Sequence, residues 1–323
     1  MSELSKTRKG LFHIIREYMI VILITMLVVI TAIVEPEFVT LGNLTNIMRQ
    51  FGPLIMVSLG MTFVIIAGFI DLSVAGTMSL VAVVTISLIQ PLGQIPALLI
   101  GMTLGAACGA LNSLIVLAVG AVTQAQALFI TYGMWQVYQA IGLIYTGGMT
   151  KHFKYIEVDY SVFTAIGKGT VGFFSVSFLI FLVICAIMFI YQSKTHMGRS
   201  ISLTGGNKIA ANLAGISIKK SIVSIYTISG LMAGIAAIIL TSRVTTASPV
   251  IGTGYETNAI LAVVLGGTAL SGGKGSVLRT VLGTLMVILL SNCMNLLGVS
   301  PYMQYMMRGA VLLLVILSDN SKS

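Results

Sequence analysis

The chain has 323 residues, of which 57% are hydrophobic and 8% are charged, and its mean hydropathy is +1.03. A soluble domain carries about 25% charged residues, so this composition leaves too little polar surface to cover a water-soluble globule. It predicts an all-α polytopic membrane protein, because apolar runs of about 20 residues cross a bilayer as helices. The formal net charge of +9 does not indicate a nucleic-acid partner, since the basic residues lie in loops between apolar runs.

Ten apolar segments predict about ten transmembrane helices in a single domain of residues 1–323. They cover residues 18–34, 53–70, 72–89, 96–119, 125–144, 173–191, 221–242, 257–270, 277–297 and 302–318. The first segment ends without a small-x-small cleavage site, so we interpret it as a retained helix. The domain divides into a first half (about 18–144), an external loop (145–172) and a second half (about 173–318).

Two places interrupt this pattern. The 257–270 run spans only about 21 Å at 1.5 Å per residue, which favours a half-helix or a re-entrant piece. The break at Asp71 is tight, so segments 53–70 and 72–89 are predicted to form either a helical hairpin or one broken helix.

The distribution of charge predicts that both chain ends lie in the cytoplasm. With ten crossings, 12 of the 18 basic residues fall in the N-terminal tail, the 192–220 loop, the 271–279 turn and the C-terminal tail. The opposite side holds five basic residues and five of the acidic ones, Glu35, Glu37, Glu157, Asp159 and Glu256. The 192–220 loop is strongly basic and free of acidic residues, so it orients the chain and offers a docking surface.

The external loop mixes aromatic and charged residues, including Lys151, Tyr155, Glu157 and Asp159. Such a mixture is typical of an interfacial aromatic belt or of a surface that docks another protein. Both interpretations stay open.

Several polar residues fall inside apolar runs. Asp71 suits the N-cap of the following helix, with a contact to substrate or a gate as the alternative. On a helix, Gln136 and Gln139 share a face with Tyr132, which either lines a pathway or forms hydrogen bonds between helices. Arg308 either reaches the membrane interface or pairs inside the bundle.

The glycines show spacings that favour close helix crossing. Gly101, Gly105 and Gly109 follow a small-x-x-x-small pattern, as do Gly230 and Gly234. By contrast, Gly272-Gly273-Lys274-Gly275 is not a phosphate-binding loop, because a hydroxyl residue does not follow the lysine. The chain is therefore not expected to hydrolyse ATP or to act as an enzyme by itself.

A weak internal similarity suggests a two-fold repeat with broken or short helices near residues 71 and 257–275. At an offset of 198 residues, four residues match: Gly68, Leu72, Ser73 and Leu80 correspond to Gly266, Leu270, Ser271 and Leu278. Repeats with broken helices are common in transporters.

A set of motifs extends from about Leu41 to Asp319. They are Gly60-Met61-Thr62-Phe63-Val64-Ile65, Ala67-Gly68-Phe69-Ile70-Asp71-Leu72-Ser73-Val74, Gly198-Arg199, Gly205-Gly206-Asn207, Gly252-Thr253-Gly254-Tyr255-Glu256, Ala262-Val263-Val264-Leu265-Gly266-Gly267-Thr268, Ser271-Gly272-Gly273-Lys274-Gly275 and Asn295-Leu296-Leu297-Gly298-Val299. With them the chain resembles the permease subunits of ATP-binding-cassette importers for ribose, xylose, arabinose and galactose. It departs from that family's pattern at Phe69, where a small residue is common, and at Ala75-Gly76, where Gly-Ser is usual.

The resemblance implies a multi-pass subunit of the bacterial inner membrane that imports a ribose-like pentose or hexose. Its implied partners are a cytoplasmic ATPase, a periplasmic sugar-binding protein and a second permease subunit, identical or related. The chain itself binds no cofactor, and ATP and Mg²⁺ are used by the ATPase.

The resemblance also assigns site residues. A short helix from Asn207 to Ala214 would couple to the ATPase, and the residues agree, since Asn207 can N-cap, Gly215 can end the helix, and Ile209 and Leu213 share a face. The expected coupling residues are Gly205, Gly206, Asn207, Ala210, Ala211, Leu213, Ala214 and Gly215. The candidate pathway or gate residues are Asp71, Ser73, Gln136, Gln139, Thr268 and Ser271. The candidate contacts with the binding protein are Lys151, Tyr155, Glu157, Asp159 and Glu256.

Alternatives stay open. Related permeases carry nucleosides, branched-chain amino acids or a furanose signal molecule, and the binding protein that selects among them is a separate chain. An ion-coupled secondary transporter is a further alternative, disfavoured by the large basic loop. A scaffold without transport activity is the most remote.

Overall fold

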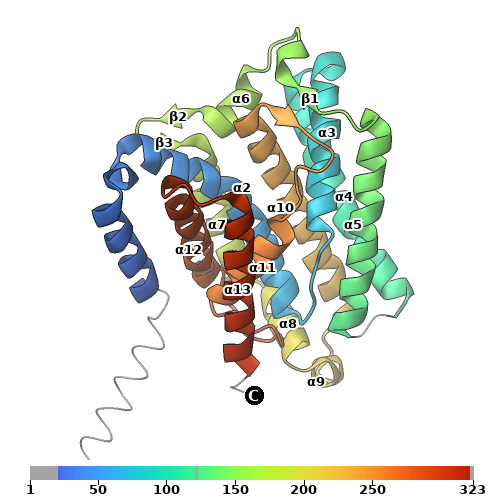
Figure 1. Ribbon diagram of the computed structural model, residues 1–323. Helices are drawn as coiled ribbons and strands as arrows, with labels where there is room; N and C mark the ends of the chain where they lie inside the picture. The colour runs from blue at the N-terminus through green and yellow to red at the C-terminus, as the bar shows by residue number, and fades with distance from the viewer. Residues whose placement is uncertain (1–20, 121–122, 321–323) are drawn as a thin grey trace, which may run out of the picture.

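The computed structural model describes residues 21–120 and 123–320. The basic residues predicted to orient the two tails, Lys6, Arg8, Lys9, Arg16 and Lys322, lie outside this part of the chain. The described residues form a helical bundle with two distinct ends (Figure 1). Each of the ten predicted apolar segments overlaps a helix within the described residues.

The elements follow one another along the bundle. The longer helices are Val21–Val34, α2 (Leu41–Ile66), α3 (Val74–Leu92), α4 (Gln94–Ala118), α5 (Gln124–Thr146), α7 (Val176–Lys194), α10 (Ile218–Val244), α12 (Val277–Leu296) and α13 (Pro301–Asn320). The shorter elements are η1 (Pro36–Val39), β1 (Lys151–His152), η2 (Phe153–Tyr155), α6 (Ser161–Lys168), β2 (Thr170–Val171), β3 (Phe174–Ser175), α8 (His196–Gly206), α9 (Lys208–Leu213), β4 (Thr246–Ala247) and α11 (Tyr255–Leu265).

Seven of the described helices are long and apolar enough to cross a membrane: α2, α3, α4, α5, α7, α10 and α12. Val21–Val34 and α11 are shorter apolar helices, so the polytopic class is confirmed while a count of ten stays a prediction. The predicted start of the second segment at residue 53 is wrong. The helix begins twelve residues earlier, at Leu41, because Thr40 accepts the Asn43 N–H as an N-cap and the helix continues through Pro53.

The predicted external loop is folded rather than irregular. The structure places α6, β1 and β2 at one end of the bundle and α8 and α9 at the other (Figure 1). β1 pairs antiparallel with β4, which follows α10, and β2 pairs with β3. The 145–172 segment is therefore held against the second half of the chain.

Close packing of α4 on α10 confirms the prediction made from the glycine spacing. A Cβ added at Gly105 would lie 2.6 Å from the backbone oxygen of Gly230, and a Cβ at Gly230 would lie 2.7 Å from the Gly109 nitrogen. Backbone therefore meets backbone along this crossing.

Arg308 pairs inside the bundle, which decides between its two interpretations. Its Nη1 donates to the side-chain oxygen of Asn258 on α11 at 3.2 Å, and its Nε donates to the Gln304 carbonyl at 3.3 Å. The guanidinium thereby joins α13 to the short helix α11.

We expect Gly105→Ala to destabilise the fold by about 1–3 kcal/mol, because the added methyl group forces two backbones apart. The thermal melting temperature of the purified protein in detergent measures this loss. Gly309→Ala on α13 is the matched control, because a Cβ there meets no atom within 4 Å. Equal melting temperatures for the two variants would contradict the close crossing.

Candidate functional site

The short helix predicted in the basic loop is present. α9 begins at Lys208, after the Asn207 side chain accepts the Ala210 N–H at 3.0 Å as an N-cap. Ala214 is the C-cap, and Gly215 follows with φ of +78°, a conformation that favours glycine. The sequence therefore predicted both the limits and the capping of this helix.

α9 presents an apolar face to its surroundings. Ile209 is 76% exposed and Leu213 is 83% exposed, whereas Ala211 is buried against the protein. A groove of about 720 Å³ runs beside the helix. It is lined by Phe69, Gly205, Gly206, Asn207, Lys208, Ile209, Asn212, Leu213, Ile218 and Ile222. Exposed aliphatic side chains such as Ile209 and Leu213, next to an apolar groove, are typical of a surface that binds a partner.

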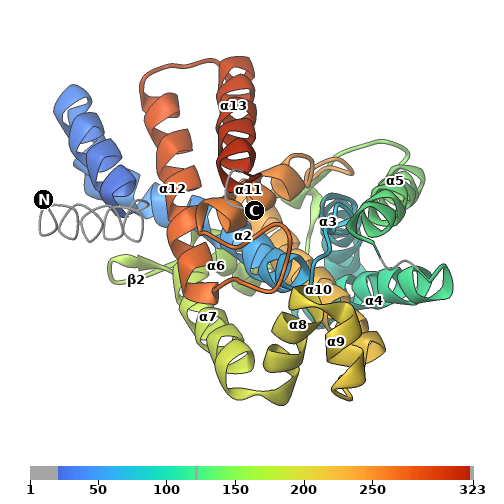
Figure 2. The same ribbon diagram turned by 90° about the horizontal axis from the view of Figure 1, so that it is seen from below.

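Three separate segments meet in a glycine junction directly before α9. We define it as Ile66 at the end of α2, Gly205 at the end of α8 and Gly273 in the α11–α12 loop. The Gly273 N–H donates to the Ile66 carbonyl at 2.8 Å. A Cβ at Gly205 would collide with that carbonyl and lie 2.7 Å from the Gly273 nitrogen, whereas a Cβ at Gly206 meets nothing within 4 Å. Figure 2, seen from this end, shows α8 and α9 beside the α11–α12 loop.

The two helix breaks have the same local geometry. At the end of α2, Gly68 N–H bonds to Ile65 O and Phe69 N–H to Val64 O. At the end of α11, Gly267 N–H bonds to Val264 O and Thr268 N–H to Val263 O. Both are Schellman caps with a glycine at positive φ, +78° for Gly68 and +82° for Gly267. The two caps are 199 residues apart, one more than the offset of the sequence match, and the two-fold repeat stays a prediction.

Asp71 is fully buried and hydrogen-bonded on both oxygens. Its Oδ1 accepts the N–H of Ser73 at 3.0 Å and the Ser73 hydroxyl at 2.6 Å, and its Oδ2 accepts the Ser229 hydroxyl at 2.7 Å. Ser73, not Asp71, occupies the N-cap of α3, so the predicted N-cap position is wrong by two residues. The carboxylate nonetheless accepts hydrogen bonds from the Ser73 N–H and from two serine hydroxyls at the non-helical break between α2 and α3.

A chain of buried hydrogen bonds continues from Asp71. The Asn112 amide on α4 donates to the Ser73 hydroxyl at 2.6 Å, and the Tyr138 hydroxyl on α5 donates to Asn112 Oδ1 at 2.8 Å. With Ser229 on α10, this Asp71 network ties the α2–α3 break to three helices. Asn112 and Ser229 were not predicted as site residues, although lone polar residues in apolar runs are a usable signal.

The remaining candidate pathway residues fall into two groups. Thr268 is buried, and exposed Ser271 lies beside Gly68, so the two breaks are neighbours. Gln136 and Gln139 lie on α5, where Gln136 is exposed and donates to the Tyr132 hydroxyl at 3.2 Å. The polar face of α5 therefore lies on the outside of a single chain.

The end of the bundle that carries α6 presents four of the five predicted contacts with the binding protein. Lys151, Tyr155, Glu157 and Asp159 are exposed. Hydrogen bonds from the Ser161 backbone and side chain hold the pKa of Asp159 below its usual value. The prediction is wrong for Glu256, which is 5% exposed and whose carboxylate accepts the Gly254 N–H at 2.9 Å. It has a capping role at α11 and does not reach this surface.

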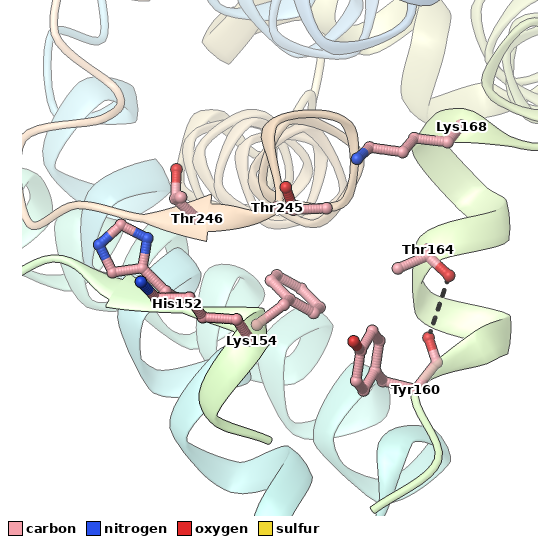
Figure 3. A pocket seen from close by; sticks show the side chains of 8 residues that line it. His152, Lys154, Tyr160, Thr164, Lys168, Thr245 and Thr246 are labelled. Atoms are coloured by element: carbon pink, nitrogen blue, oxygen red, sulfur yellow. Dashed lines mark hydrogen bonds between the residues drawn. The ribbon is translucent and has the colours of Figure 1, made fainter. Parts of the chain in front are cut away.

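A pocket of about 390 Å³ opens at the same end. It is lined by His152, Phe153, Lys154, Tyr160, Thr164, Lys168, Thr245 and Thr246. Figure 3 shows Lys168 reaching from α6 toward Thr245 across this pocket. Its lining contains two lysines and no carboxylate.

The sequence is similar to known proteins over nearly the whole chain. Residues 43–316 match the family described as branched-chain amino acid transport system / permease component. The ribose import permease protein of Haemophilus influenzae is 34% identical over 99% of this chain and 97% of its own length. The ribose import permease protein of Escherichia coli K12 is 36% identical over 93% of this chain and 92% of its own length.

A third relative differs in its named sugar. The galactose/methyl galactoside import permease protein of Escherichia coli K12 is 29% identical over 100% of this chain and 98% of its own length. No solved structure matches the chain. Because the family model covers most of the sequence, the chain belongs to the family of transport-system permease components.

Proposed function

We propose that this chain is the transmembrane subunit of an ATP-binding-cassette importer for a monosaccharide, a ribose-like pentose or a hexose. The observation that carries the proposal is the exposed apolar face of α9, held in the basic loop directly after the glycine junction. Relatives named for ribose and for galactose match the chain over almost its full length.

The α8–α9 end is the cytoplasmic side in this proposal. It carries Lys194, Arg199, Lys208, Lys219, Lys220, Lys274 and Arg279. Positive charge is enriched on the cytoplasmic side of inner-membrane proteins. A separate ATPase would receive Ile209 and Leu213 there, and it would bind the ATP and Mg²⁺ that the reaction uses.

The opposite end faces the periplasm and receives a soluble sugar-binding protein. The exposed residues Lys151, Tyr155, Glu157 and Asp159 support this assignment, since aromatic and charged side chains together favour docking. The lysine-lined pocket beside them would accept acidic groups of that partner.

The sugar pathway forms between two permease subunits, identical or related. The α5 face with Gln136 and Gln139 supports this arrangement, because Gln136 is exposed and Gln139 half-buried on the single chain, and both side chains can hydrogen-bond hydroxyl groups. A second candidate substrate class is branched-chain amino acids, favoured by the description of the matching family. Nucleosides and a furanose signal molecule are further alternative substrates.

Uptake into proteoliposomes tests the proposal. The permease is reconstituted with its ATPase and binding protein, and labelled ribose, galactose, leucine and a nucleoside are compared with and without ATP. ATP-dependent uptake of a monosaccharide is the expected result. Uptake of leucine alone would assign the second class, and uptake that needs an ion gradient but no ATPase would contradict the proposal.

Leu213→Ser is expected to lower uptake and co-purification with the ATPase by about tenfold, because it removes an exposed apolar contact at the proposed interface. Affinity purification of the complex measures the loss. Val171→Ser is the control, since Val171 is 62% exposed at the other end and should leave the ATPase bound. A normal complex with Leu213→Ser would contradict the role of α9.

Gly205→Ala and Gly42→Ala form a matched pair of helix glycines. The first places a methyl group against Ile66 and Gly273 and the second meets no neighbour, so only Gly205→Ala should disturb the glycine junction. We expect sugar uptake to fall at least about threefold for Gly205→Ala and to stay normal for Gly42→Ala. Equal uptake by both variants would mean that the junction has no part in transport.

Asp71→Asn is expected to lower uptake more than folded yield. Asparagine keeps the side-chain volume and an oxygen for the bonds to Ser73, but it removes the negative charge and replaces the acceptor of the Ser229 hydroxyl by an NH2 donor. Size-exclusion chromatography measures the yield and labelled sugar measures uptake. If both fall by the same factor, Asp71 acts only in folding.

A further inference from the structure

Lys208 makes a contact that neither capping nor membrane orientation requires. It is the first residue of α9, and its ammonium lies 3.9 Å from the centroid of the Phe69 ring. The side chain is half-buried, and burial lowers its pKa below the usual value. A cation over an aromatic face is attracted by the ring quadrupole, and more strongly where water is excluded.

Phe69 packs against α10 as well as against Lys208. It is fully buried, and its ring lies 6.3 Å from the ring of Tyr226 on α10. Its N–H bonds to Val64 in the Schellman cap of α2, and it stands two residues before Asp71. A force on this ring is therefore transmitted to the α2–α3 break instead of being absorbed by a mobile side chain.

The glycine junction contacts the end of α2 at a second point. Gly205, which precedes α9 by three residues, packs on the Ile66 carbonyl, and Ile66 ends α2 three residues before Phe69. The end of α8 thus contacts the end of α2 through backbone at Gly205, and α9, which follows directly, contacts the α2–α3 break through the Lys208 side chain. Two separated contacts fix the position and the tilt of a short helix, whereas one leaves it free to rotate.

We propose that Lys208 is a positioning residue that couples α9 to the α2–α3 break through Phe69, so that a displacement of α9 moves the Asp71 network. This inference rests on the proposed function, because the displacement comes from the ATPase. Lys208 then acts inside this chain, and its charge does more than orient the loop or attract the ATPase.

The test uses the complete importer with ATPase and binding protein in proteoliposomes, and measures sugar transported per ATP hydrolysed. Lys208→Met keeps the alkyl stem and removes the cation, so the ratio should fall at least about threefold while the ATPase stays bound. Lys208→Arg should retain the ratio. Lys219→Met is the matched control, since it removes the same charge from the same loop at an exposed site.

A double-mutant cycle ties the effect to the ring. Phe69→Leu should lower the ratio as Lys208→Met does, and the double variant should lower it no further. Phe69→Trp keeps an aromatic face and replaces Phe69→Leu if that variant does not fold. The proposal is overturned if the double variant lowers the ratio by the product of the two single effects. It is also overturned if Lys208→Met leaves the ratio unchanged or loses the bound ATPase.

A readout on the permease alone separates this inference from the proposed function. A spin label at Leu213→Cys, which is 83% exposed in the native chain, reports the mobility of α9 without ATPase or sugar. Lys208→Met should increase that mobility and Lys219→Met should not. If the α9 label is equally mobile in the native and Lys208→Met permeases, the inference is overturned even if the importer transports sugar. If the label is more mobile in Lys208→Met but the importer takes up no sugar, the positioning role stands and the proposed transport function fails.

Discussion

The two helix breaks depend on satisfying backbone and carboxylate groups without help from water. A bilayer offers no hydrogen-bond partners, so non-helical backbone inside it must be paired within the protein. At the α2–α3 break the pairing comes from the Schellman cap, from the Gly273 N–H on the Ile66 carbonyl, and from Asp71 with Ser73 and Ser229. These bonds reach α10 and the α11–α12 loop, so the break organises the bundle around it.

Glycine residues make this pairing possible because they let backbone segments approach closely. The Gly273–Ile66 bond requires the end of α8 and the α11–α12 loop to approach α2 at backbone distance, which a Cβ at Gly205 would prevent. The α4–α10 crossing uses the same device at Gly105 and Gly230. Close backbone packing thus serves both the stability of the bundle and the placement of α9.

The position of α9 follows from these contacts. The glycine junction lies directly before it, Lys208 contacts Phe69 on the break, and Ile209 and Leu213 remain exposed. A partner that binds the exposed face therefore acts on a helix that contacts the α2–α3 break and directly follows the glycine junction. This arrangement suits a permease that receives mechanical work from a separate ATPase.

The sequence by itself determined the membrane class, the helical segments, the close glycine crossing and the limits of α9, because hydropathy, glycine spacing and capping residues are local signals. It placed the start of α2 and the N-cap of α3 incorrectly, since those depend on the cap at Thr40 and on Ser73. Only the tertiary structure brought Asn112, Tyr138 and Ser229 to Asp71, buried Glu256 and set Lys208 over Phe69. Those contacts join residues far apart in the chain, so only the packed bundle creates them.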